Sequence, residues 1–138
     1  MITHEIRVTG DGSKTIFLPE LNETYHSSNG AVQESRHIFI ENGLDLVEKQ
    51  GAIRILEVGF GTGLNALLSA SWAEMNNQRI HYIGIEAFPL SPELCFQLDY
   101  PRHIGQNSEK IYNALIRCDW EMDNQLSTHF SIQKREVK

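Results

Sequence analysis

The chain has 138 residues, about one domain, and its 41% share of hydrophobic residues is ordinary for a soluble globular protein. Its formal net charge of -6 argues against a self-sufficient nucleic-acid binder, because phosphate affinity comes mainly from clustered Lys and Arg. No run approaches the roughly 18 apolar residues of a membrane span, and no signal-peptide pattern opens the chain, so we expect a cytoplasmic protein.

The first expected elements are two short β-favouring runs, residues 6–8 and 15–18. They flank a turn cluster at residues 10–13, where glycines tolerate a positive φ. This pattern predicts an N-terminal β-hairpin. Residues 31–40 then predict a helix with four side chains near one face, Val32, Ser35, Ile38 and Phe39. A glycine at position 43 would end this helix before a short turn at residues 44–49.

A βαβ unit follows in the sequence. Residues 52–58 form a short, mostly apolar run, typical of a strand buried on both faces of a parallel sheet. Residues 80–85 return to a strand-like pattern. Between them, residues 64–75 carry side chains at helical spacing, Leu64, Leu67, Leu68, Ser71 and Met75. Strand, helix and strand in this order predict parallel pairing.

The last part of the chain predicts two helices and one more core strand. Ser91 is a good N-cap, and Pro92 and Glu93 suit a first helical turn, so we expect a helix over residues 93–98. Residues 108–116 predict a second helix, and residues 130–137 predict a third core strand.

Three glycines join the first core strand to its helix, in the string Glu57-Val58-Gly59-Phe60-Gly61-Thr62-Gly63. Glycines let the backbone pass close to a ligand, and the helix N-terminus behind them offers free N–H groups. A dinucleotide fingerprint would place the third glycine one residue later, which disfavours a nicotinamide oxidoreductase. The compressed spacing resembles motif I of class I methyltransferases, whose loop holds the amino-acid end of S-adenosyl-L-methionine.

An acidic residue, Glu86, ends the second predicted strand. A carboxylate in this position can accept hydrogen bonds from both hydroxyls of a ribose. Alone, the glycines could form an ordinary tight turn, and Glu86 could be a solvated strand end. Because both features occur together at a suitable distance, the cofactor interpretation is favoured.

Three segments resemble one family, the MnmC-like methyltransferases, including the stand-alone form called MnmD. They are Tyr25-His26-Ser27-Ser28-Asn29-Gly30, Glu34-Ser35-Arg36-His37-Ile38-Phe39-Ile40, and the glycine string extended through Leu64-Asn65. The resemblance runs from about Ile16 to the C-terminus. It implies methylation of the exocyclic amine of 5-aminomethyl-2-thiouridine at the tRNA wobble position. An FAD-dependent oxidase domain follows in bifunctional relatives, so an oxidase of the same pathway is an expected partner.

The resemblance also implies the cofactor-binding residues. The segment before motif I folds over the cofactor in this family, and an aromatic residue after Asp119 would lie near the adenine. The resulting set is Tyr25, Ser28, Asn29, Glu34, Glu57, Gly59, Phe60, Gly61, Thr62, Gly63, Asn65, Glu86, Asp119 and Trp120. The alternatives are a polar turn at residues 27–30, an exposed helical Glu34 and a structural Trp120. No catalytic residue is assigned.

The implied fold class is α/β, a Rossmann-like class I methyltransferase fold with an incomplete parallel sheet and an N-terminal β-hairpin. Residues 1–50 would be the hairpin and cofactor-covering segment, and residues 51–138 the first half of the S-adenosylmethionine-binding domain. The family's acceptor-pocket stretch, Asp-Ala/Gly-Phe-Ala-Pro, does not occur. We therefore expect a truncated and by itself inactive chain, with tRNA gripped mostly by regions outside it.

Two other functions remain open at this point. One is a non-catalytic module that binds S-adenosylmethionine or serves assembly, and the other is a methyltransferase acting on a different amine or small molecule. No metal is expected, because no pair of Cys or His has ligand spacing. The six histidines are interpreted as surface or satisfied polar residues.

Overall fold

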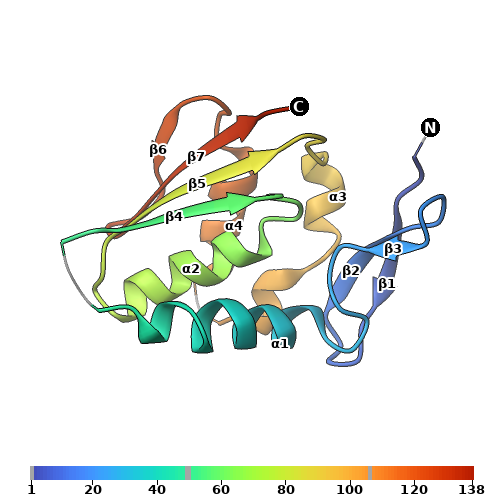
Figure 1. Ribbon diagram of the computed structural model, residues 1–138, viewed down its shortest axis with the longest axis horizontal. Helices are drawn as coiled ribbons and strands as arrows, with labels where there is room; N and C mark the ends of the chain where they lie inside the picture. The colour runs from blue at the N-terminus through green and yellow to red at the C-terminus, as the bar shows by residue number, and fades with distance from the viewer. Residues whose placement is uncertain (1, 49–50, 106) are drawn as a thin grey trace.

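The computed structural model describes residues 2–48, 51–105 and 107–138, which form a small sheet, a main sheet and a layer of helices (Figure 1). The small sheet is antiparallel with the order β1-β2-β3, whose bounds are Glu5–Val8, Lys14–Leu18 and Glu23–Thr24. The predicted hairpin is confirmed as β1 and β2. The third strand has only two residues, too few to show an alternating pattern, and it was not predicted.

The turn between β1 and β2 caps the helix α1 (Ala31–Ser35). Three side-chain oxygens of this turn accept hydrogen bonds from the first amides of α1. Ala31 N donates to Thr9 Oγ1 at 3.0 Å, Val32 N to Ser13 Oγ at 3.0 Å and Gln33 N to Asp11 Oδ2 at 2.8 Å. The first amides of a helix have no partner within the helix, and the N-cap Gly30 has no side chain to supply one. The turn therefore fastens the small sheet to α1.

Beyond α1 the helical winding changes. Residues Arg36–Glu41 form a π-helix and Leu44–Leu46 a 3-10 helix, so the predicted helix is interrupted in its regular pitch. Ile38 is 59% exposed, and its expected place on the apolar face is wrong. The reason is that the wider π turn breaks the 3.6-residue spacing on which that expectation rested. Residue 49 of the expected turn lies outside the described residues.

The main sheet has the order β4-β5-β7-β6. Strands β4 (Ile53–Val58), β5 (Ile80–Glu86) and β7 (Phe130–Glu136) run parallel, as predicted, and α2 spans Leu64–Met75 between the first two. The sheet is nevertheless mixed, because β6 (Asp123–Gln125) pairs antiparallel with β7. The expectation of a purely parallel sheet is corrected on this point. Asp, Asn and Gln are poor strand formers, so β6 left no signal in the sequence.

The helices pack against one face of the main sheet (Figure 1). Leu56 and Val58 in β4 point away from this layer and are 62% and 81% exposed, so the expected burial of this strand on both faces is wrong. Met75, the last of the helically spaced residues of α2, is exposed as well. A parallel strand is buried on both faces only where helices cover both, and the described residues cover one.

Two further helices complete the layer, α3 (Pro92–Phe96) and α4 (Ser108–Arg117). The predicted N-cap of α3 is confirmed, because Leu94 N donates to Ser91 Oγ at 3.2 Å. A short 3-10 helix, η3 (Tyr100–His103), lies between them and brings the buried Tyr100 to the core.

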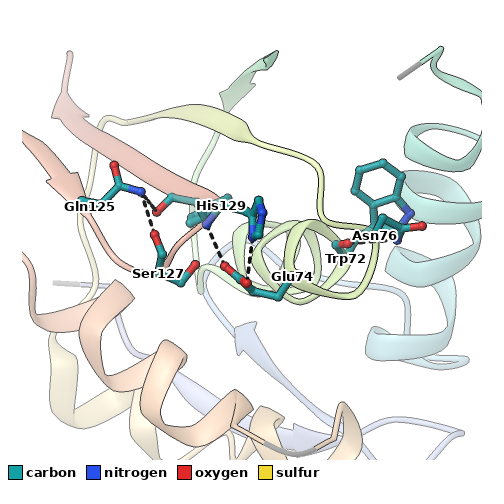
Figure 2. Close-up of polar contacts among 7 residues, drawn as sticks. Trp72, Glu74, Asn76, Gln125, Ser127 and His129 are labelled. Atoms are coloured by element: carbon teal, nitrogen blue, oxygen red, sulfur yellow. Dashed lines mark hydrogen bonds and ion pairs between the residues drawn. The ribbon is translucent and has the colours of Figure 1, made fainter. Parts of the chain in front are cut away.

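The C-terminal end of α2 is tied to the start of β7 (Figure 2). The carboxylate of Glu74 accepts hydrogen bonds from the backbone amide of His129 at 2.8 Å, and its other oxygen lies 3.0 Å from His129 Nδ1. This contact fixes α2 at the end opposite the glycines that begin it.

Candidate functional site

The glycine loop lies at the carboxyl end of β4 and leads into α2. Gly59, Gly61 and Gly63 have φ values of +87°, +56° and +79°, a region that other residues rarely adopt. The amides of Gly59 and Phe60 both donate to the carbonyl of Ile85, at 2.8 and 2.9 Å. The loop is therefore folded back onto the end of β5, with the amides that start α2 directly behind it.

Glu86 contacts this loop directly. Its Oε1 accepts a hydrogen bond from Gly61 N at 2.7 Å, and its Oε2 accepts one from Phe88 N at 3.0 Å. The structure thus brings together the two features that the sequence placed 25 residues apart. A half-buried carboxylate beside main-chain amides is well placed to receive hydroxyl donors from a ligand on the same edge.

A second carboxylate, Glu57, is held under the loop. Its two oxygens accept hydrogen bonds from Tyr82 Oη at 2.7 Å and from Asn65 Nδ2 at 2.8 Å. Burial raises the pKa of Glu57 to about 7, and the hydrogen bonds from Tyr82 and Asn65 offset part of this effect. The side-chain oxygen of Asn65, Oδ1, is buried and has no hydrogen-bond partner among the described residues. These groups offer a negative charge and a free acceptor to a nearby cation.

The segment before α1 covers the loop. Tyr25 Cδ2 lies 3.3 Å from where a Cβ on Gly61 would stand, so the ring passes over the glycine. Burial and the carboxylate of Glu86 both raise the pKa of Tyr25. Tyr25, Glu34 and Asn65 share the wall of a cavity of about 200 Å³. Tyr25 therefore reaches the loop, and Glu34 faces the first turn of α2 across this cavity.

Two predicted residues of the covering segment, Ser28 and Asn29, do not line this cavity. Ser28 and Asn29 are exposed, and the Ser28 carbonyl accepts a hydrogen bond from Gly10 N at 3.0 Å, in the turn of the small sheet. Asn29 lines a separate, shallow hollow together with Glu34. Both residues belong to the turn into α1, and the contact of this segment with the glycine loop comes from Tyr25.

Phe60 points into the core below the loop. It is 5% exposed, and a Cβ on Gly84 would lie 2.6 Å from its Cδ1. Its ring meets the ring of Trp120 edge to face, with centroids 6.2 Å apart. Trp120 is half-buried and lies under Lys134, whose Nζ is 5.0 Å from the ring centroid. Phe60 is thus the floor of the site, whereas Trp120 is only half-buried and Asp119 is exposed.

Three residues at the site were not predicted from the sequence, His26, Tyr82 and Gly84. Gly84 could have been found, because a glycine inside a strand often marks a close approach of other atoms. Tyr82 and His26 act through partners 25 and 36 residues away, and no local pattern signals such contacts. Among the described residues, no group of three metal-ligating side chains occurs, and no helix is long and apolar enough to cross a membrane.

Known proteins similar to this chain share one family name. No protein-family model matches the chain. Curated relatives are named tRNA 5-methylaminomethyl-2-thiouridine biosynthesis bifunctional protein MnmC. The one from Burkholderia multivorans is 35% identical over 86 residues, which are 57% of this chain and 13% of the relative. The one from Leptospira interrogans is 39% identical over 84 residues, which are 54% and 12%.

A solved structure is similar over nearly the whole chain. The crystal structure of MnmC2 from Aquifex aeolicus superposes with a TM-score of 0.75 and 27% sequence identity, covering 99% of this chain and 43% of that one. The predicted fold class and the resemblance to the MnmC-like proteins are confirmed. The matched segments span only about an eighth of the curated relatives.

Proposed function

We propose that the chain binds S-adenosyl-L-methionine at the carboxyl edge of β4 and β5 and serves methylation of the exocyclic amine of 5-aminomethyl-2-thiouridine in tRNA. The hydrogen bond between Gly61 N and Glu86 carries this proposal, because it joins the glycine loop and the ribose-type acid in one site. The names of the relatives supply the substrate class, which is tRNA that carries a precursor of 5-methylaminomethyl-2-thiouridine.

The residues present fit the cofactor at two points. At Gly59 nothing lies within 4 Å of where a Cβ would stand, so the loop backbone is open there to a ligand. The buried Oδ1 of Asn65 lacks a donor among the described residues, and the ammonium group of a methionine moiety would supply one. Glu57 beside it would balance the positive charge. Glu86 would bind the ribose, and the half-buried Trp120 would lie near the adenine.

S-adenosylmethionine supplies an electrophilic methyl group when bound. The protein's part is to bind and orient, because in-line displacement at that carbon needs alignment and the exclusion of water. The glycine loop and Glu86 fix the position of the ligand, and Tyr25 shields it from solvent on the side of the small sheet. The acceptor must approach as a neutral amine, and the proton that it sheds on methylation would pass to a nearby base or to water.

The function is tested in the organism that carries the gene. In a strain that lacks the gene, total tRNA should contain 5-aminomethyl-2-thiouridine in place of the 5-methylaminomethyl form. Mass spectrometry of the digested nucleosides measures this change. A plasmid copy of the complete gene should restore the methylated form, and the same gene with Gly61→Val should not. An unchanged nucleoside profile in the deletion strain would contradict the proposed substrate.

A second candidate is a non-catalytic module that binds the cofactor and takes part in assembly. The exposed Leu56 and Val58 favour it, because an apolar strand face of this kind usually meets another surface. The same deletion experiment separates the two functions. A module would bind S-adenosylhomocysteine normally while its loss left the methylated nucleoside unchanged.

A further inference from the structure

His26 joins three separate parts of the fold. Its Nε2 lies 3.2 Å from the hydroxyl of Thr62 in the glycine loop. Its Nδ1 lies 2.9 Å from the hydroxyl of Thr15 in β2 and 3.3 Å from the hydroxyl of Tyr100 in η3. Tyr100 in turn donates to the carbonyl of Lys14 at 2.8 Å, which fixes that hydroxyl against the small sheet. One imidazole ring thus links the small sheet, the helical layer and the loop.

The ring is held in its neutral form, because burial lowers the pKa of His26 to about 4. A neutral imidazole has one donor nitrogen and one acceptor nitrogen. The hydroxyls of Thr15 and Thr62 can each donate or accept, so both nitrogens are satisfied at once. The backbone amide of His26 also donates to Thr15 Oγ1, at 3.0 Å. These bonds fix the orientation of the ring as well as its position.

Thr62 stands between two glycines, whose backbones are the least restricted in the chain. It is 1% exposed, and its carbonyl accepts a hydrogen bond from Tyr112 Oη at 2.8 Å. The loop is therefore held on two sides, through the side chain by His26 and through the main chain by Tyr112. Loss of the contact to His26 would remove one of the side-chain contacts that hold this residue from outside the loop.

We propose that His26 is a positioning residue that seats the small sheet on the glycine loop and holds the loop in the form that accepts the cofactor. Tyr25, the neighbour of His26 in the chain, passes over Gly61, so the same contact also sets the cover above the loop. This inference rests on the proposed function for its ligand, S-adenosylmethionine, and on the contacts of Thr62 for its mechanism.

The test is a double-mutant cycle on the affinity for S-adenosylhomocysteine, measured by isothermal titration. His26→Ala and Thr62→Val should each weaken binding roughly tenfold, which is the effect of losing one hydrogen bond that orders the site. The double variant should bind about as weakly as His26→Ala, because both changes remove one shared contact. Thr62→Ser keeps the hydroxyl and should bind like the wild type. The matched control is His37→Ala, an exposed histidine paired with Glu41.

Hydrogen exchange of the amides of residues 59–63 provides a readout that needs no ligand. Exchange should be faster in His26→Ala and Thr62→Val than in His37→Ala. If His26→Ala does not fold, Thr62→Val still breaks the same contact with the ring in place. Wild-type affinity in either folded variant, or fully additive losses in the double variant, would overturn the inference. If the wild-type protein does not bind S-adenosylhomocysteine, the proposed function fails, and the exchange rates alone decide the role of His26.

Discussion

The carboxylate of Glu86 accepts a hydrogen bond from the backbone amide of Gly61 at 2.7 Å. The contact bridges the ends of two adjacent parallel strands, so the acid and the loop keep a fixed distance from each other. Its other oxygen accepts from Phe88 N, which turns the chain away after β5. A ligand bound at this edge would meet the loop amides and the carboxylate together.

Replacing Glu86 by Gln should weaken cofactor binding by roughly 1.5–3 kcal/mol, because charge-assisted hydrogen bonds to the ribose are lost. The fold should survive, since the residue ends a strand and an amide oxygen can still accept from Gly61 N. Titration with S-adenosylhomocysteine measures the loss. Glu136→Gln is the matched control, because Glu136 is the register partner of Glu86 on β7 and is exposed. Normal binding by the Glu86 variant would identify this carboxylate as structural.

Replacing Gly61 by Val should abolish cofactor binding. The residue has a φ of +56°, which a β-branched side chain strongly disfavours, and its Cβ would meet the Tyr25 ring at 3.3 Å. The added methyl groups would also enter the space between loop and cover. Circular dichroism establishes whether the variant is folded before titration. Unchanged affinity in a folded variant would mean that the loop is only a turn.

Cofactor binding should release a proton near pH 6.5. Burial raises the pKa of Glu57 from 4.5 to about 7. Between pH 4.5 and about pH 7, the folded protein therefore holds a proton that the unfolded chain has lost. The contribution of Glu57 to the stability of the fold falls as pH rises through this range. An ammonium group beside Glu57 would lower that pKa, so affinity should rise as pH increases through this range. Titrations at about pH 6.5 in buffers of different ionisation enthalpy count the protons. Zero release would contradict the placement of a cation at Glu57.

Replacing Asp11 by Ala should destabilise the fold by about 1–2 kcal/mol, because the amide of Gln33 would lose its capping acceptor and the turn of the small sheet would lose three more hydrogen bonds, from Thr9 and Ser13. Urea unfolding monitored by circular dichroism measures the change. Asp123→Ala, at an exposed carboxylate that only approaches His81 at 3.9 Å, is the control and should leave stability nearly unchanged. Equal effects of the two substitutions would argue against a capping role for Asp11.

Local patterns predict the parts of this fold that depend on local chemistry. The bounds of α2 follow from its apolar spacing, and the cap of α3 follows from a serine before a proline. The strand β6 could not be predicted, because Asp-Asn-Gln pairs with β7 only through the tertiary position of the neighbouring hairpin turn. The π-helix also has no recognised signal, and it moved Ile38 out of the predicted core face.

Among the residues of the site, too, local patterns predict some positions and miss those that depend on tertiary contacts. The glycine string and Glu86 were predicted because both positions have backbone or charge requirements visible in the sequence. From the sequence, His26 is interpreted as a surface or satisfied polar residue. It is satisfied, but its partners, Thr15, Thr62 and Tyr100, come from three distant segments that only the folded chain brings together.

The most direct test of the central claim is a titration of the protein with S-adenosylhomocysteine, run in parallel with NAD. The account predicts saturable binding of S-adenosylhomocysteine at one site, its loss in Gly61→Val, its weakening in Glu86→Gln, and no comparable binding of NAD. Failure of the wild-type protein to bind S-adenosylhomocysteine, or equal or tighter binding of NAD, would contradict the assignment of this edge of the sheet as a methyl-donor site.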